Sequence, residues 1–309
     1  MKLKLLFITR NFQYNLEKNT YYLSCQLAKI TDLALWFESG NIDEILNKIP
    51  FRPDFILLND MKDTHCPEVT GLKTVEIPFG IIMHDLHYKV KKRKEFIKEN
   101  NVKHIFSIYR DAFYKRYPEF FERMRWLPHF VNTHIFKDYN LPRENNWLMM
   151  GRVSKYYPLR RKMLEVMGSR PGFVYHKHPG YRTIQKEEEN TVFIGEKYAK
   201  EINRSHIFLT CDLIYHYPII KYYEVLACKT LLLAPSSKEL YDLGFLPGVH
   251  FVEINESNFL RMADYYLKYD KERHRIIEQG FNLIHQHHTV EKRAYQLVQM
   301  IEDILKSGY

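Results

Sequence analysis

Short, nearly continuous apolar runs alternate with helical segments along most of the 309-residue chain. Runs such as residues 2–8, 54–58 and 77–83 have the length of a strand that is buried on both faces. Strands of this kind that are separated by helices are typical of parallel sheets covered on both sides. The pattern therefore predicts an α/β fold with two doubly wound, Rossmann-like domains in tandem.

The alternation lapses around residues 132–146, which are rich in Asn, Asp and Pro, and then begins again. This break predicts an amino-terminal domain of residues 1–140 and a carboxyl-terminal domain of residues 141–288, followed by a last helix within 289–309. Expected strands lie at 2–8, 33–37, 54–58, 77–83, 102–108, 147–150, 173–176, 191–194, 206–211, 231–234 and 250–254. Expected helices lie at 16–30, 42–49, 88–100, 158–167, 197–203, 218–228 (with Pro218 in its first turn), 258–268, 273–284 and 289–305.

Apolar segments and cysteine spacing indicate the compartment in which the protein resides. No apolar stretch approaches the about 18 residues of a membrane span, and the amino terminus turns polar too early for a signal peptide. The four cysteines are widely spaced and form no C-x-x-C pair, which favours reduced thiols over a disulfide framework. We therefore expect a cytoplasmic protein, with peripheral attachment to a membrane as an option.

The net charge of +9 favours anionic partners without choosing among small phosphates, anionic lipid and nucleic acid. The densest basic run, residues 89–94, suits a solvated helix face, an anionic membrane surface or nucleic acid. No obligate protein partner is evident from the sequence.

Several common catalytic and nucleotide-binding motifs are missing from the sequence. It has no G-x-x-x-x-G-K-[ST] and no G-x-G-x-x-G, which argues against a P-loop NTPase or a standard dinucleotide dehydrogenase. It has no G-x-S-x-G and no D-x-D in a suitable context, and residues 285–288 offer three histidines without a Cys or carboxylate partner. The sequence predicts no metal ligands and no bound cofactor.

Candidate site residues in the second domain follow the predicted strands. Ligands of open α/β sheets bind at the carboxyl ends of the strands, where loops lead into helices. Arg152, Lys155 and Lys221 offer positive charge to a diphosphate, and a helix amino terminus adds to it. Glu224 offers oxygens to the vicinal hydroxyls of a ribose, although each cation also suits a solvated loop and Glu224 also suits a surface pair with Lys221.

These residues carry a resemblance to a known family. Gly151-Arg152 with Lys155, the run 192–195 that ends in Gly195, and the block Lys221 to Thr230 resemble the donor half of group 1 glycosyltransferases of the GT-B fold. Residues 239–252 resemble the branch related to the spore-maturation protein CgeB.

The resemblance implies a nucleotide-diphosphate sugar, UDP- or GDP-linked, as the donor. By position, Glu224 is the ribose-binding glutamate, Arg152 and Lys155 bind the diphosphate, and the main chain at Gly195 meets the nucleobase. The resemblance also implies that the last helix packs back on the amino-terminal domain and that the anomeric configuration is retained. Two positions depart from the family: the first acid of its E-x7-E motif falls at His216, and a glycine falls at Lys229.

The first domain offers His84 and Asp85 at the end of a predicted strand. In the resemblance, this pair is the element whose histidine contacts the transferred sugar, and Asp85 orients it or assists the acceptor as a base. A histidine and an aspartate buried for packing alone explain the pair equally well.

Three functions are consistent with the sequence. The first is a metal-independent glycosyltransferase that acts on an unidentified acceptor, which is a surface or spore glycan or a protein. The second is a glycosyltransferase of hydroxymethylated DNA bases, suggested by the charge and by the basic and aromatic stretch 109–125. The third is an inactive nucleotide-sugar-binding module, suggested by the acid missing at position 216.

Overall fold

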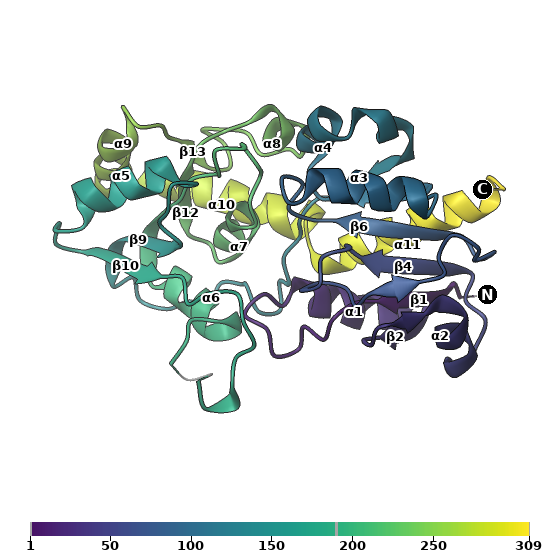
Figure 1. Cartoon of the computed structure of the whole chain (residues 1–309). Helices are drawn as coiled ribbons and strands as arrows, with labels where there is room; N and C mark the ends of the chain where they lie inside the picture. The colour runs from purple at the N-terminus through teal and green to yellow at the C-terminus, as the bar shows by residue number, and fades with distance from the viewer. Residues whose placement is uncertain (1, 189–190, 309) are drawn as a thin grey trace. The chain divides into compact units, whose positions relative to one another are not determined.

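The computed structural model describes residues 2–188 and 191–308, which form two compact units (Figure 1). Unit 1 contains the described residues up to Gln13, Asn19–Pro128 and the residues from Glu291 onward. Unit 2 contains Tyr14–Lys18 and His129–Val290. The predicted division at residue 140 therefore differs from the observed one, because residues 129–140 make their contacts within unit 2.

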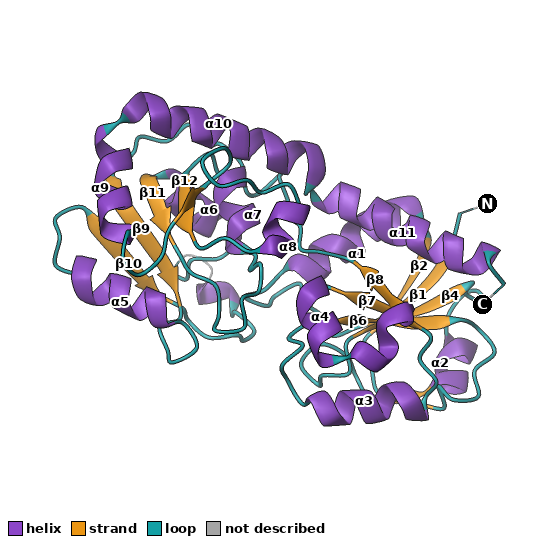
Figure 2. Ribbon diagram, turned by 90° about the horizontal axis from the view of Figure 1, so that it is seen from above, coloured by secondary structure: helices purple, strands orange, loops and turns teal. Residues whose placement is uncertain are grey.

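The sheet of unit 1 is fully parallel, with the strand order β2-β1-β4-β6-β7-β8. Helices α3 and α4 cover one face of this sheet, and α1 and α11 cover the other (Figure 2). The strands are β1 (Lys4–Ile8), β2 (Asp32–Trp36), β4 (Phe55–Asn59), β6 (Phe79–Met83), β7 (His104–Ser107) and β8 (Met124–Trp126). The helices are α1 (Asn19–Ile30), α2 (Ile42–Lys48), α3 (Val90–Glu99), α4 (Arg110–Arg116), the 3-10 helix η1 (Pro118–Arg123) and α11 (Val290–Lys306), and β3 (Gly40–Asn41) pairs with β5 (Val69–Thr70).

The sheet of unit 2 is also parallel, with the strand order β10-β9-β11-β12-β13. Its strands are β9 (Asn145–Gly151), β10 (Phe173–Lys177), β11 (Ser205–Leu209), β12 (Leu231–Ala234) and β13 (Val252–Glu253). Its helices are α5 (Pro158–Met167), the 3-10 helix η2 (Lys186–Glu188), α6 (Gly195–Asn203), α7 (Lys221–Ala227), α8 (Lys238–Asp242), α9 (Phe259–Lys268) and α10 (Asp270–His287).

Alternating side chains of β9 build two cores, one on each face of the unit 2 sheet. Leu148 and Met150 pack with residues of α6 and α7, whereas Trp147 and Met149 pack with residues of α5 and α9. Because both faces are covered, every second residue is apolar on each side and the strand reads as a continuous apolar run. The strand order reverses between β9 and β11, which is where doubly wound sheets bind ligands at their carboxyl ends.

The structure confirms the α/β class, the parallel sheets and the two Rossmann-like domains, but three local predictions are wrong. Residues 191–194 form a loop before α6 and no strand, because Gly195 follows at once with φ of +49° and turns the chain. Helix α7 begins at Lys221, so Pro218 lies outside it. In addition, no helix or strand was predicted for residues 110–126, which form α4, η1 and β8.

No helix in the part of the chain that the structure describes is both long and apolar enough to cross a membrane.

Candidate functional site

The carboxyl end of β9 is shaped by Gly151. Its φ is +136°, and a Cβ at this position would lie 2.9 Å from Nη1 of Arg160, so the turn requires glycine. In the sheet, Gly151 pairs with Lys177 at the end of β10. The next residues on the two strands, Arg152 and His178, therefore leave the sheet side by side at its carboxyl edge.

Arg160 reaches this edge from α5. Its Nη1 donates to the carbonyl of Arg152 at 2.8 Å, and its Nη2 donates to Oγ1 of Thr210 at 3.1 Å and to the carbonyl of Cys211 at 3.2 Å. The residue is only 3% exposed, and none of these partners is a carboxylate. Because no carboxylate neutralises this buried guanidinium, its positive charge favours the binding of an anionic ligand.

The charges of three cations act on His178. Burial and the nearby charges of Lys221, Arg160 and Arg152 lower the pKa of His178 to about 4. Lys221 begins α7, Arg160 belongs to α5 and Arg152 follows β9, so three separate elements deliver positive charge to one place.

The buried Glu224 lies in the first turn of α7. Its Oε2 accepts hydrogen bonds from Nζ of Lys221 at 2.7 Å and from the hydroxyl of Tyr198 at 3.1 Å. The pair that the sequence suggested for an exposed helix surface therefore exists, but its glutamate is buried and its lysine half-buried. Burial and the adjacent Glu224 raise the pKa of Tyr198 well above its usual value, so its hydroxyl stays protonated and donates. Both bonds use Oε2, and Oε1 of Glu224 has no hydrogen bond from any residue that the structure describes.

Two other predicted donor residues differ in their surroundings. Lys155 is exposed, with Nζ 5.5 Å from the ring centre of Tyr156, and it is not one of the three cations that act on His178. Gly195 begins α6 with φ of +49°, and nothing lies within 4 Å of the place of a Cβ. The main chain at Gly195 is therefore open to a neighbouring group.

The two departures from the family pattern have visible local structures. Nδ1 of His216 lies 2.8 Å from Oδ2 of Asp212, so a carboxylate is present four residues before the expected position. His216 and Lys229 both adopt left-handed backbones, each with φ of +56°. At Lys229 the side chain forms ion pairs with Glu278 at 3.0 Å and Asp138 at 3.6 Å.

In unit 1, the predicted His84 and Asp85 follow β6 and take part in different interactions. Nε2 of His84 lies 2.9 Å from Oδ1 of Asn59, whose amide nitrogen donates to Thr9 at 3.0 Å, so the His84 ring donates to Asn59. Asp85 accepts a hydrogen bond from Nζ of Lys62 at 2.9 Å. Burial opposes ionisation of Asp85, but Lys62, with smaller contributions from His84 and His87, lowers the pKa of this carboxyl to about 2.

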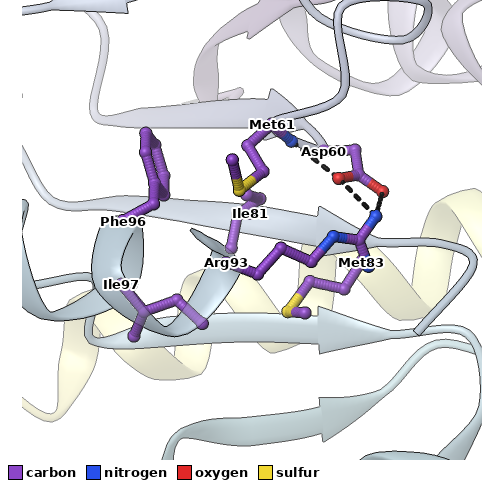
Figure 3. A pocket seen from close by; sticks show the side chains of 7 residues that line it. All are labelled: Asp60, Met61, Ile81, Met83, Arg93, Phe96 and Ile97. Carbon is purple, nitrogen blue, oxygen red and sulfur yellow. Dashed lines mark hydrogen bonds and ion pairs between the residues drawn. The ribbon is translucent and has the colours of Figure 1, made fainter. Parts of the chain in front are cut away.

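A buried ion pair fixes the backbone at His84. Arg93 donates to both carboxylate oxygens of Asp60, at 2.8 Å and 2.7 Å, and to the carbonyl of His84 at 2.9 Å. Asp60 in turn accepts from the backbone N–H of His84 at 3.0 Å. Figure 3 shows this pair beside a small apolar pocket lined by Met61, Ile81, Met83, Phe96 and Ile97.

Among the described residues, no three or more His, Cys, Asp or Glu side chains are grouped so that they would hold a metal ion.

Four residues of these interactions were not predicted as site residues from the sequence: Arg160, Tyr198, Asn59 and Lys62. One signal was available for Arg160, because it shares the buried face of α5 with Met163 and Met167 at helical spacing. An arginine on an apolar helix face needs polar partners, and here those partners lie at the carboxyl ends of the strands. The other contacts depend on tertiary register, which spacing does not reveal.

The comparison with protein families matches residues 152–299 to a family described as glycosyl transferase-like. A comparison with curated protein sequences finds no match. The family match supports the predicted resemblance to group 1 glycosyltransferases, whereas the CgeB-related branch stays a prediction.

Solved structures with similar folds cover nearly the whole chain. Anabaena Alr3699/HepE in complex with UDP and glucose has a TM-score of 0.67 and 10% identity, covering 97% of this chain and 100% of that one. A glycosyltransferase from Rickettsia africae ESF-5 has a TM-score of 0.64 and 11% identity, covering 99% of both chains. An alpha-glucosyltransferase in complex with UDP-glucose and DNA containing an abasic site has a TM-score of 0.62 and 10% identity, covering 96% of this chain and 98% of that one.

At these identities the solved structures establish the fold, and the family match supplies the class of activity. The chain therefore has the GT-B fold, and the match of residues 152–299 to a glycosyl transferase-like family assigns its activity to the glycosyltransferases.

Proposed function

We propose that the protein transfers a sugar from a UDP- or GDP-linked donor to an acceptor, with retention of configuration and without a metal ion. The gathering of Arg152, Arg160 and Lys221 at the carboxyl edge of the unit 2 sheet carries this proposal. Two of them, Arg152 and Arg160, have no carboxylate partner among the described residues. Fixed positive charge of this kind stabilises the charge that develops on a leaving diphosphate.

Each donor residue has a role that its surroundings support. The diphosphate is bound by Arg152, Arg160 and Lys221. The exposed Lys155 adds positive charge to it from the solvent side. Oε1 of Glu224 accepts from a ribose hydroxyl, while Lys221 and Tyr198 hold the carboxylate through Oε2. The open main chain at Gly195 contacts the nucleobase. Helix α7 has only seven residues, so side chains rather than its amino terminus supply the positive charge.

His84 and Asp85 are proposed as the catalytic residues of unit 1. Asn59 and the Asp60–Arg93 pair fix the ring and backbone of His84, which suits a histidine that positions a sugar hydroxyl. The low pKa of Asp85 keeps it ionised at neutral pH, so it acts through its charge and its bond to Lys62 rather than as a strong base.

The acceptor is proposed to be a surface or spore glycan or a protein, with the enzyme in the cytoplasm. The basic run 89–94 begins at the residue before α3 and continues into its first turns, where Lys91 and Lys92 are exposed and suit contact with an anionic membrane surface. We also propose that the protein belongs to the CgeB-related branch, on the resemblance of residues 239–252.

A panel of nucleotide-diphosphate sugars tests the donor site by thermal shift. A donor at about 100 times its dissociation constant stabilises a protein by about 2.7 kcal/mol. We expect a shift with at least one donor in the wild type and its loss in Glu224→Ala, whereas Glu256→Ala removes an exposed glutamate and keeps the shift. Circular dichroism confirms that the variants are folded.

Absence of a shift with every donor, or an unchanged shift in Glu224→Ala, contradicts the proposed site. Transfer of the sugar to hydroxymethylated DNA, with salt-sensitive retention on heparin, would replace the glycan or protein acceptor by DNA. Donor binding without hydrolysis or transfer would instead support an inactive binding module.

A further inference from the structure

His178 occupies a defined place at the candidate donor site of unit 2. It follows β10 directly, and the pairing of Lys177 with Gly151 sets it beside Arg152. Its ring packs against that of Tyr181, with the ring centres 4.6 Å apart. The register of the sheet and this ring contact together fix the imidazole at the edge where the cations gather.

The hydrogen bond of the His178 ring determines where its proton lies. The backbone N–H of Gly180 donates to Nδ1 of His178 at 2.9 Å, so Nδ1 is an acceptor. A neutral imidazole carries its proton on the other nitrogen, which is Nε2. His178 therefore offers one N–H donor from Nε2.

The charges around His178 keep this donor neutral. Burial and the charges of Lys221, Arg160 and Arg152 hold the pKa of His178 near 4, so the ring is uncharged at neutral pH. A neutral donor fits among three cations without repelling them, and an anionic ligand gives all four groups a common acceptor.

We propose that His178 is a further ligand of the donor diphosphate and donates a hydrogen bond from Nε2 to one of its oxygens. This inference rests on the proposed donor site and adds a residue to it. It assigns to His178 a neutral contact that complements the charged contacts of Arg152 and Arg160.

Two substitutions separate the ligand contact from the local turn. Asparagine places an oxygen near the position of Nδ1, so His178→Asn keeps an acceptor for Gly180 but removes the donor. Glutamine places an amide nitrogen near the position of Nε2, so His178→Gln keeps the donor. Calorimetric titration with UDP-glucose, and with GDP-mannose beside it, measures the effect on the diphosphate contact.

We expect His178→Asn to weaken binding of the nucleotide sugar by about tenfold or more, as for other hydrogen bonds to charged groups. His178→Gln should stay within about threefold of the wild type, and the affinity for the free nucleoside should be equal in all three proteins. Equal nucleotide-sugar affinity in wild type and His178→Asn would overturn the inference.

A second readout follows the charge of the ring in the wild-type protein. Binding of UDP-glucose adds negative charge beside His178 and should raise its pKa above the free value of about 4. The histidine ring signals in NMR, assigned by their loss in His178→Asn, report this shift. A pKa that does not move on binding contradicts the contact, whereas failure of the wild type to bind either nucleotide sugar contradicts the donor site itself.

Discussion

Arg160 shows how one residue connects the core of unit 2 to its candidate site. The side chain leaves the apolar face of α5, and its Nη1 and Nη2 donate to oxygens at the ends of β9 and β11, whereas its buried Nε has no hydrogen-bond partner among the described residues. Neutral partners only partly offset the cost of burying a charge. An anion bound at this edge would supply the missing negative charge, so binding and stability are linked at this residue.

Lys229 gives a prediction at the same scale. Its left-handed backbone, with φ of +56°, costs about 1 kcal/mol relative to glycine, and its ion pairs with Glu278 and Asp138 offset part of this cost. Lys229→Ala keeps the backbone cost and loses the ion pairs. We expect it to lower the free energy of unfolding by about 1 kcal/mol, measured by urea denaturation.

Lys229→Gly is the matched control, because it loses the same ion pairs and also relieves the backbone. It should be about 1 kcal/mol more stable than Lys229→Ala. Equal stability of the two variants would show that the left-handed backbone has no cost here.

Residue types and spacing pointed to several residues of the candidate site, whose roles stay predictions. Among them, Lys221 bonds Glu224, and Lys221 and Arg152 both act on the pKa of His178. Tyr198 is different, because its hydroxyl meets Glu224 only through the packing of α6 on α7. Contacts that depend on how two helices pack leave no trace in local spacing.

At the scale of elements, the most regular segments were predicted best. The helix Pro158–Met167 and the strand Leu231–Ala234 match their predicted bounds. No helix or strand was predicted for the stretch that contains α4, η1 and β8, although most of its aromatic residues were expected to be core. Its buried Phe113, Tyr117 and Phe120 are core residues, but the short helices around them give no extended periodicity.

The first residue of β7 makes the stability of unit 1 depend on pH. Burial, together with the charges of Arg125 and Lys103, lowers the pKa of His104 to about 4 in the folded state. The unfolded chain binds a proton at about pH 6.5, so it holds more protons than the folded chain between these values. The contribution of His104 is therefore complete above pH 6.5 and is lost as the pH falls toward 4.

We expect His104→Gln to reduce the loss of unfolding free energy between pH 7 and pH 4.5, measured by urea denaturation at both values. His274→Gln, which changes an exposed histidine of α10, should leave that loss as it is in the wild type. An equal pH dependence in wild type and His104→Gln would contradict the assignment.

At the scale of the whole molecule, the chain passes between the two units more than once. Residues 14–18 leave unit 1 and pair with residues 182–184 of unit 2, through an antiparallel bridge between Asn15 and Thr183. The chain leaves unit 1 again after Pro128 and returns at Glu291. Helix α11 then supplies core residues to unit 1, which include the fully buried Leu297, Ile301 and Ile304.

Because each unit has its own core, a mutation in the core of unit 1 should destabilise unit 1 and leave unit 2 unchanged. Ile301→Ala removes buried methyl and methylene groups from unit 1 and should lower its stability by about 2–5 kcal/mol. Hydrogen exchange should become faster in peptides of β1, β4 and β6 and stay unchanged in peptides of β9, β11 and β12. Tyr295→Ala, at a residue that is 59% exposed, is the control. Faster exchange confined to unit 2 would contradict this division.

The return of α11 to unit 1 also sets an order for folding during synthesis. A ribosome makes the strands of unit 1 first, but it makes the helix that covers one of their faces last. Unit 2 is synthesised in between, apart from residues 14–18, so it is free to fold while one face of the first sheet is covered by α1 without α11. Nascent chains that stall after α10 would therefore hold a nearly complete unit 2 and an unfinished unit 1, whose partly exposed apolar face favours binding by chaperones.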